Sequence, residues 1–434
     1  MRSLSIKILL VGSGGREDAI ATKLQESGAE IYAAMGNRNP SILRYSRASL
    51  IARETDWDKI LNFAILNKVD LAFIGPDPVL ATPLVDSLTD KGVPTASPSM
   101  NAARIETDKI FMRNLLEKHG VAGGVLNKSF TSEKECTEWI SSYQKDFVVK
   151  PRGLTGGKGV RVMGDHFSSS QEGLNYALDI IKKDGSVLIE EKLVGEEFSL
   201  QAFTDGTTLT GMPLAQDYKR AYEGDTGPNT GGMGSITDSD HLLPFIDRKS
   251  RDDAFNILKQ VSIALRNEGY PFRGIMYGQF MLTQSGVRLI EINARFADPE
   301  GINVLSILQD SLVDILFGVA NGNLSSRINF LKKATVLRYV VPIGYGSQPK
   351  PGRLSIDPLK DKSTKMYYAA VNGSLSSIEM TSSRSIAIVG IAESIPDAAK
   401  KVDAASSLVH GEYYMRRDIG TAEMLARKMA RFRH

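Results

Sequence analysis

Residues 150–160 read Lys-Pro-Arg-Gly-Leu-Thr-Gly-Gly-Lys-Gly-Val, a glycine-rich turn between two short apolar runs. Such a turn can fold over phosphates, because glycine lets the backbone approach the oxygens and lysine adds positive charge. It differs from the P-loop, since Lys158 precedes a second strand and does not open a helix. Alone, however, a turn of this kind is more often a solvated hairpin. Lys150 and Lys158 therefore need support from other parts of the chain.

A second segment, residues 190–197, reads Glu-Glu-Lys-Leu-Val-Gly-Glu-Glu. A charge run is usually a solvated face. Beside a phosphate-binding hairpin, however, it suits an adenosine pocket, in which backbone groups and Leu193 hold the base. A carboxylate would then accept the ribose hydroxyls, and Glu197 is the better candidate.

A third segment, residues 288–300, reads Arg-Leu-Ile-Glu-Ile-Asn-Ala-Arg-Phe-Ala-Asp-Pro-Glu. Residues two apart in a strand face the same side, so Glu291, Asn293 and Arg295 are expected to project together. That arrangement gives hard oxygen ligands for magnesium beside a guanidinium that can stabilise a transferring phosphoryl group. A lone copy of the pattern fits an exposed strand face equally well.

Taken together and in this order, the three segments resemble the ATP-grasp superfamily. Within it, the chain resembles the phosphoribosylamine-glycine ligase family from end to end. The most specific match is the ten-residue run Asp-Thr-Gly-Pro-Asn-Thr-Gly-Gly-Met-Gly at 225–234. Further matching segments lie at 12–17, 216–220, 295–300 and 416–420.

The resemblance implies a reaction of de novo purine biosynthesis. ATP phosphorylates the carboxylate of glycine, and the amine of 5-phosphoribosylamine then attacks the acyl phosphate to give glycinamide ribonucleotide, ADP and phosphate. The expected cofactors are ATP and Mg²⁺ or Mn²⁺. No covalent enzyme intermediate is required, so the protein mainly positions the reactants and neutralises charge.

The resemblance also implies roles for individual residues. The catalytic residues are expected to be Arg295 and Lys158. The ATP-binding residues are expected to be Lys109, Lys150, Lys158, Glu190, Glu191, Leu193 and Glu197. The metal ligands are expected to be Glu291 and Asn293, with Gln279 a weaker ligand because its amide is neutral. The expected substrate-binding residues are Gly14, Gly15, Arg16, Asp217, Lys219, Asn229, Gly231, Gly232, Arg295 and Asp298. Within this set, the glycine turn at 14–16 suits the phosphate of the phosphoribosylamine, because it opens a helix.

Several positions depart from the family pattern. Asp18 and Tyr218 stand where histidine is common, and Ala297 replaces a glycine. Gln279 stands where many ATP-grasp enzymes place a metal-binding carboxylate. Because Lys150, Lys158 and the Glu291 segment are retained, these departures are interpreted as differences between subfamilies.

Hydrophobic patterning predicts an α/β and α+β multidomain fold. Residues 1–104 are predicted to form a parallel α/β substrate domain, with strands at 6–11 and 71–74 and a helix at 17–25. The resemblance implies that residues 105–330 form an ATP-grasp domain of two α+β lobes, with a mobile lid lobe at about 124–194. Residues 331–434 are predicted to form a small β-rich domain. Antiparallel strands are expected at 147–150, 160–163, 187–190 and 198–203, a hairpin at 275–292, a charged connection at 238–253, and later strands at 335–341, 365–371 and 385–391.

Composition narrows the function class. The 53 Lys and Arg residues nearly balance 50 Asp and Glu, so no global field draws the chain onto nucleic acid or a membrane. The single cysteine, Cys136, excludes an internal disulfide and a zinc site of several thiolates. We expect a cytoplasmic monomer or homodimer that acts on small molecules, with no nucleic-acid or membrane partner.

Three alternatives stay open. Another ATP-grasp ligase or carboxylase of the purine pathway would share the ATP residues but lack the run at 225–234. A catalytically silent nucleotide-binding regulator would not need Glu291, Asn293 and Arg295 intact. A dinucleotide-dependent oxidoreductase would fit the turn at 12–15, but no acidic residue closes a second βαβ strand.

Overall fold

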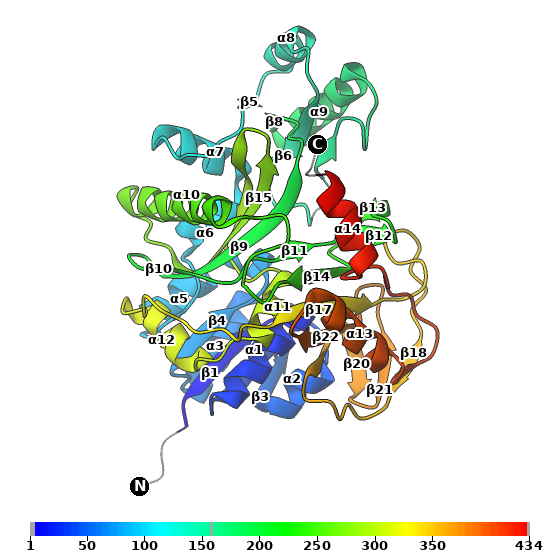
Figure 1. The fold of residues 1–434 in the computed structure, drawn as a ribbon. Helices are drawn as coiled ribbons and strands as arrows, with labels where there is room; N and C mark the ends of the chain where they lie inside the picture. The colour runs from blue at the N-terminus through cyan, green and yellow to red at the C-terminus, as the bar shows by residue number, and fades with distance from the viewer. Residues whose placement is uncertain (1–4, 157–158, 432–434) are drawn as a thin grey trace.

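The computed structural model describes residues 5–156 and 159–431, so Lys158 lies outside the described residues. The chain forms stacked α/β layers, with the N-terminal sheet at one end, an antiparallel core in the middle and a small lobe at the other end (Figure 1). The predicted class, a mixture of parallel α/β and antiparallel α+β parts, is confirmed.

The N-terminal layer is a parallel sheet of order β3-β2-β1-β4. Residues 8–11 of β1 are fully buried, as expected for a parallel strand that is covered on both faces. The apolar stretch ending at Leu88 is interrupted at Pro83, so it forms two short helices. The elements are β1 (Lys7–Val11), α1 (Gly15–Glu26), β2 (Glu30–Met35), α2 (Pro40–Tyr45), β3 (Ser46–Ile51), α3 (Trp57–Asn67), β4 (Leu71–Ile74), α4 (Asp77–Leu80), α5 (Leu84–Asp90) and α6 (Met100–Thr107).

A small lobe follows, with an antiparallel sheet of order β5-β8-β6-β7 and its own apolar core. Phe130, Phe147 and Ile189 lie in this core with Cys136, whose thiol pKa is raised to about 11 by burial. The elements are α7 (Lys109–Lys118), β5 (Asn127–Phe130), α8 (Glu133–Ser142), β6 (Phe147–Pro151), β7 (Arg161–Val162), α9 (Ser170–Asp184) and β8 (Val187–Glu191).

The central sheet has the order β10-β9-β15-β16 and is antiparallel. The antiparallel strand predicted at 198–203 is confirmed as part of β9, which pairs along its whole length with β15 and belongs to a different sheet from the strands predicted at 147–150, 160–163 and 187–190. The predicted hairpin at 275–292 is confirmed. The elements are β9 (Glu196–Asp205), β10 (Leu209–Gly211), β15 (Arg273–Thr283), β16 (Gly286–Asn293) and the covering helix α10 (Arg248–Asn267).

The charged connection predicted at 238–253 is also wrong in its last part. Helix α10 begins at Arg248, because the side chain of Asp247 accepts a hydrogen bond from the Ser250 amide and caps the helix. Lys249 and Asp253 then pair one turn apart on its surface.

Three C-terminal strands join a five-stranded sheet of order β11-β14-β17-β22-β19, to which residues 216–237 supply the other two strands. Four more C-terminal strands form a separate sheet of order β20-β21-β18-β23. The predicted strand at 365–371 ends at Tyr368, and a new strand starts at Val371. No described helix is long and apolar enough to cross a membrane. The elements are β11 (Gln216–Asp217), β12 (Arg220–Tyr222), β13 (Thr226–Asn229), β14 (Gly234–Thr237), α11 (Glu300–Ser306), α12 (Leu312–Asn321), β17 (Ala334–Val340), β18 (Arg353–Ile356), β19 (Thr364–Tyr368), β20 (Val371–Ser374), β21 (Ser377–Met380), β22 (Ile386–Ala392), α13 (Ile395–Ser406), β23 (Val409–His410) and α14 (Ala422–Arg431).

Candidate active site

The end of β16 carries a hydrogen-bonded row of three side chains. Asn293 Nδ2 donates to Glu291 Oε1 at 3.3 Å, and Arg295 Nη2 donates to Asn293 Oδ1 at 3.2 Å. The expected common face of Glu291, Asn293 and Arg295 is therefore confirmed. We call these three residues the catalytic row.

Arg295 is held among carboxylates that the sequence did not single out. Its Nη2 lies 3.3 Å from Glu106 Oε1, and its Nε lies 3.7 Å from Asp77 Oδ1. Burial raises the pKa of Glu106 to about 7, and the Asp77 and Glu291 charges add to this although Arg295 opposes it. Arg295 Nε is buried and has no hydrogen-bond acceptor among the residues the structure describes. The guanidinium therefore keeps a donor available for a ligand.

The oxygen donors expected for a metal lie on two neighbouring strands. Gln279 of β15 is directly opposite Glu291 of β16, which places both on one face of the sheet. Gln279 also receives a hydrogen bond from the Tyr277 hydroxyl and donates to Glu197 Oε2 at 2.9 Å. Within residues 5–156 and 159–431, no three His, Cys, Asp or Glu side chains are grouped for a metal. One carboxylate with amide oxygens suits magnesium, which takes its other oxygens from water and phosphates.

Lys150 lies in a buried ion-pair cluster that joins the small lobe to the central sheet. Its Nζ lies 2.6 Å from Glu190 Oε2, and Arg113 Nε donates to Glu190 Oε1 at 2.6 Å. Burial alone would raise the pKa of Glu190, but the charges of Arg113 and Lys150 lower it to about 2. Arg113 also donates to the carbonyls of Leu289 and Ile290 at 3.1 and 2.7 Å. The Glu190 carboxylate is thus occupied by these two cations.

Lys109 holds the first half of the glycine-rich hairpin. Its Nζ donates to the Gly153 carbonyl at 2.7 Å, and its amide donates to the Arg152 carbonyl at 2.9 Å. Burial lowers its pKa and the charge of Lys150 acts in the same direction, while Glu291 opposes them. Lys109 therefore lies between the hairpin and the catalytic row.

The connection from β8 to β9 contains the remaining nucleotide candidates. Glu191 Oε1 accepts a hydrogen bond from the Leu126 amide at 2.8 Å, and Leu193 lies in the loop between the two strands. Glu197 Oε2 accepts from Lys219 Nζ at 2.7 Å. Although burial acts in the opposite direction, Lys219 lowers the pKa of Glu197.

At the N-terminal sheet, the glycine turn after β1 packs closely against its neighbours. The Gly14 amide donates to Glu17 Oε2 at 2.8 Å, and a side chain at Gly15 would collide with the Tyr339 hydroxyl. Arg16 is buried, and it donates to Glu17 Oε1 at 2.6 Å and to the Phe296 carbonyl at 2.9 Å. Its guanidinium is therefore anchored to the central sheet.

Asp298 is the meeting point of three parts of the chain. The Tyr339 hydroxyl donates to its Oδ1 at 2.6 Å, and Arg384 Nη2 donates to its Oδ2 at 2.9 Å. Arg384 Nη1 also donates to the carbonyls of Gly231 and Gly232. The structure thus gathers Gly231, Gly232 and Asp298, through two C-terminal residues that sequence reasoning missed.

Asp217 is buried beside the same glycines. Gly232 has φ +103°, and a Cβ there would come within 2.8 Å of Asp217 Oδ1. That oxygen is buried and, among described residues, has no hydrogen-bond donor. Burial and the neighbouring Glu300 carboxylate raise the pKa of Asp217. Asn229, by contrast, lies on the exposed β12–β13 hairpin opposite Arg220.

Two departures from the family pattern have structural partners. Asp18 is fully buried, and its Oδ2 accepts a hydrogen bond from the Tyr368 amide at 2.6 Å. The Ala297 amide donates to Gln201 Oε1 at 2.8 Å within the core. Both positions lie in contacts between elements.

Comparison with known proteins agrees with this geometry. Residues 6–106 match the N domain of phosphoribosylglycinamide synthetase, and residues 107–301 match its ATP-grasp (A) domain. This chain belongs to the phosphoribosylglycinamide synthetase family. The predicted family and the predicted class of ATP-dependent ligase are both confirmed.

Relatives of this family match the chain over almost its whole length. The phosphoribosylamine–glycine ligase of Pyrococcus horikoshii is 44% identical to this chain, and the aligned region covers 98% of this chain and 97% of the relative. The enzyme of the same name from Methanothermobacter thermautotrophicus is 46% identical and covers 98% of each.

Solved structures share the fold. The phosphoribosylamine–glycine ligase of Thermotoga maritima has a TM-score of 0.81 at 23% identity, covering 95% of this chain and 100% of that one. A biotin carboxylase from Campylobacter jejuni, in complex with an ATP analogue, has a TM-score of 0.76 at 15% identity, covering 98% and 96%. These likenesses show that the chain shares its fold with both proteins.

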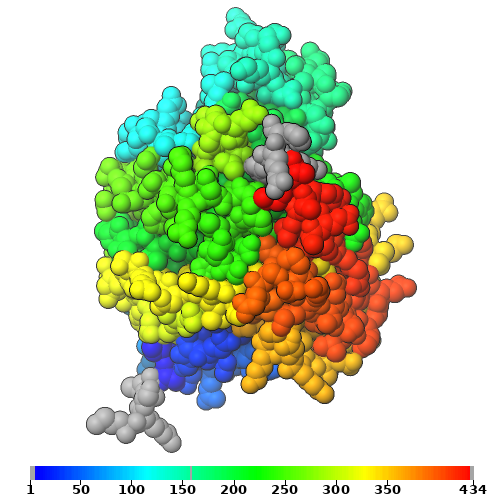
Figure 2. Space-filling model, in the orientation of Figure 1, coloured from blue at the N-terminus to red at the C-terminus, as the bar shows by residue number. Residues whose placement is uncertain are grey.

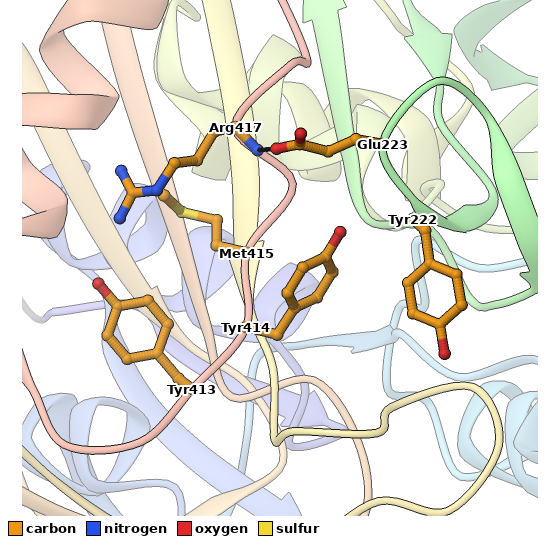
Figure 3. A pocket seen from close by; sticks show the side chains of 6 residues that line it. All are labelled: Tyr222, Glu223, Tyr413, Tyr414, Met415 and Arg417. Carbon is orange, nitrogen blue, oxygen red and sulfur yellow. Dashed lines mark hydrogen bonds between the residues drawn. The ribbon is translucent and has the colours of Figure 1, made fainter.

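Two open pockets lie outside the residues expected for synthetase chemistry. One, of about 520 Å³, lies between β12 and the segment before α14, and it is lined by Tyr222, Glu223, Tyr413, Tyr414, Met415 and Arg417 (Figure 3). The other, of about 610 Å³, has five lysines in its wall, Lys23, Lys333, Lys362, Lys365 and Lys401. Neither contains a predicted ligand-binding residue.

Proposed function

We propose that this chain joins glycine to 5-phosphoribosylamine, using ATP, in purine biosynthesis. The observation that carries the proposal is the catalytic row, which lies between the lysines of the small lobe and the Asp217 cluster. The charge of Glu291 raises the pKa of both Lys109 and Lys219, although burial opposes this in each lysine. The expected phosphate, metal and substrate residues thus surround one strand end.

In the first proposed step, a carboxylate oxygen of glycine attacks the γ-phosphorus of ATP, and the bond to ADP breaks. Lys109 and Lys150 hold the phosphates, and Lys158 is expected to assist from the hairpin. Arg295, which ends the catalytic row and is held by Glu106 and Asp77, faces the transferred group. Donors fixed in advance stabilise charge that develops during transfer without reorganising.

In the second step, the amine nitrogen of phosphoribosylamine attacks the carbonyl carbon of glycyl phosphate. The amide bond forms, phosphate leaves, and the amine loses a proton. The reactants must be held in contact for this step, so positioning supplies much of the rate. Water must also be kept away from the acyl phosphate.

The donor set fits a hard divalent ion. We propose that Glu291 and Asn293 hold Mg²⁺ or Mn²⁺, with Gln279 as a weaker ligand because its amide oxygen is neutral and already accepts a hydrogen bond. When bound, such an ion neutralises phosphate charge and orients the nucleotide.

For the nucleoside, we propose that the chain around Glu190, Glu191 and Leu193 holds the adenine and that Glu197 accepts the ribose hydroxyls. The Glu190 carboxylate binds Arg113 and Lys150, so the base contacts would come from backbone groups of this segment. The charge of Glu190 then serves to place Lys150.

For the other substrates, the turn at Gly14 and Gly15 suits the phosphate of phosphoribosylamine, because its amides open helix α1. Arg16 anchors that turn. Asp298, Gly231 and Gly232 lie beside it, and the unmatched Oδ1 of Asp217 is suited to a substrate amine. Asn229 and Lys219 are retained as substrate-binding candidates.

The small lobe, residues 124–194, is proposed to close over bound ATP. Its separate apolar core allows it to move as a unit, and closure would exclude water from the acyl phosphate. We further propose that the enzyme acts on these small molecules in the cytoplasm as a monomer or homodimer.

Substrate omission tests the proposal. Phosphate release from ATP should require glycine and freshly generated phosphoribosylamine together, and the amide product should form in equal amount. Arg295→Ala should abolish most of this rate, while the exposed α10 variant Arg251→Ala should retain it. If another carboxylic acid supports faster turnover than glycine, the substrate assignment is wrong.

A further inference from the structure

Tyr218 lies between two residues of the proposed substrate site. Asp217 and Lys219 flank it, and Lys219 points to Glu197 with a separation of 2.7 Å. Neighbouring side chains of an extended segment point to opposite sides, so Tyr218 faces away from the site. It is only 2% exposed.

On that far side, Tyr218 contacts the C-terminal helix α14. Lys428 Nζ lies 4.6 Å from the centre of the Tyr218 ring, within the range of a cation–π interaction. The same Nζ lies 3.4 Å from Glu196 Oε2 at the start of β9. Lys428 therefore connects α14 to strand β9 and to the segment between β11 and β12.

Gln216 completes a closed set of contacts. The Tyr218 hydroxyl donates to Gln216 Oε1 at 3.1 Å. Gln216 Nε2 donates to the Glu197 carbonyl at 2.9 Å and to Glu196 Oε2 at 3.4 Å. Lys428, Tyr218, Gln216 and Glu196 thus form a ring of interactions that includes the backbone of Glu197.

Lys428 is unusual for a residue on a terminal surface helix. Its side chain is 10% exposed, whereas Arg427 beside it is exposed. Burying a lysine is unfavourable unless its charge is matched, and helix packing alone needs only apolar residues such as the buried Met424. Its charge also lowers the pKa of Glu197, after the larger effects of burial and Lys219.

A second cation of the C-terminal segment also lies near the Tyr218 ring. The Arg416 guanidinium lies 5.5 Å from the Tyr218 ring centre and is paired with Asp418 and Asp225 at 2.7 and 2.8 Å. The Arg417 amide donates to Glu223 Oε1 at 3.0 Å (Figure 3). Helix α14 lies beside β12 and β13 on the outside of the molecule (Figures 1 and 2).

We propose that Lys428, Tyr218, Gln216 and Glu196 form a positioning cluster, through which helix α14 sets the place of Glu197 in the nucleotide site and of Lys219, which pairs with Glu197, in the substrate site. This rests on the proposed function only in assigning Glu197 to the nucleotide. The four residues act through Glu197 and Lys219 and do not touch the reacting atoms. The C-terminal helix is thereby part of the machinery for binding ATP.

The main test compares Lys428→Met with Lys428→Arg and with the exposed neighbour Arg427→Met. For each variant, the Kd of ADP with Mg²⁺ is measured by calorimetry, and KM for ATP and glycine is measured in the ligase assay. Lys428→Met should raise both the Kd of ADP and KM for ATP by roughly tenfold. This is the lower end of the loss of affinity that follows when a residue supporting a binding residue is removed. KM for glycine should change less. Lys428→Arg should restore most of the affinity, and Arg427→Met should match wild type.

Tyr218→Phe is a second variant in case Lys428→Met does not fold. It keeps the buried ring but removes the hydrogen bond to Gln216, and it should also weaken ADP binding. Tyr367→Phe, which removes the hydroxyl of another buried tyrosine, bonded to Ser306, is its control. Lower Tm with unchanged ADP affinity in both test variants would overturn the cluster. ADP binding does not depend on which acid is ligated. If glycine is not turned over, the proposed function is wrong, but the ADP affinities of the variants still test the cluster.

Discussion

The small lobe and the body of the molecule are built differently. The lobe encloses its own apolar core, whereas one continuous core runs through the N-terminal layer, the central sheet and the C-terminal strands. Between them lie polar contacts, chiefly Arg113 with Glu190 and with the β16 carbonyls. This difference supports the proposal that the lobe moves as a unit while the catalytic row stays fixed.

The largest effect is expected on the fixed side. Arg295→Ala removes the guanidinium that we propose faces the transferred group, so kcat should fall by roughly 10²–10³-fold, about 3–4 kcal/mol of barrier. Rapid-quench measurement of single-turnover phosphoryl transfer would check this. A variant that keeps normal single-turnover rates would show that the row does not act in phosphoryl transfer.

The second-largest effect is expected at the polar contacts between the lobe and the body. Arg113→Met leaves Glu190 buried with one cation fewer, which should lower the free energy of unfolding by about 3 kcal/mol. Urea unfolding would measure the loss, and hydrogen exchange should show it first in β8. Replacing both residues, as Arg113→Met with Glu190→Leu, should recover part of the stability. Lys182→Met, on the exposed face of the lobe, is the control.

A smaller effect is expected at the two backbone connections of the lobe. A Cβ on Gly195 would lie 2.1 Å from the Leu282 carbonyl oxygen, whereas one on Gly124 would have no neighbour closer than 3.9 Å. Gly195→Ala should displace the lobe relative to β15 and raise KM for ATP, at a cost of about 1–3 kcal/mol. Gly124→Ala should leave KM unchanged. Equal behaviour of the two variants would contradict a hinge at Gly195.

The smallest effect concerns the body alone. Burial raises the pKa of Asp18 to about 7 from an ordinary value of 3.8. Between these values the folded chain binds the proton and the unfolded chain does not, so this group lowers stability as pH rises from about 4 to about 7.

Asp18→Asn removes that titration, so the stability of this variant relative to wild type should increase as the pH rises from 4 to 8. Denaturant unfolding at both pH values would measure it, with the exposed Asp58→Asn as control. Parallel pH profiles for Asp18→Asn and wild type would contradict the burial effect.

The difference between local contacts and contacts distant in sequence explains what could be predicted from the sequence. The catalytic row and the β15–β16 hairpin follow local periodicity, so their geometry was predictable. The sheet of β9 was not, because strand pairing depends on partners distant in sequence. Glu106, Arg113, Tyr339 and Arg384 were missed for a related reason. Each is remote in sequence from the segment that it contacts, and no local motif marks it.

The central claim is that a glycine carboxylate is activated as an acyl phosphate beside the catalytic row. Turnover of glycine labelled with ¹⁸O in its carboxylate tests it most directly, with the released phosphate analysed by mass spectrometry. The account predicts that each phosphate carries one oxygen from glycine, because that oxygen bonds to phosphorus before the amine displaces it. Unlabelled phosphate, released together with the amide product, would contradict the account.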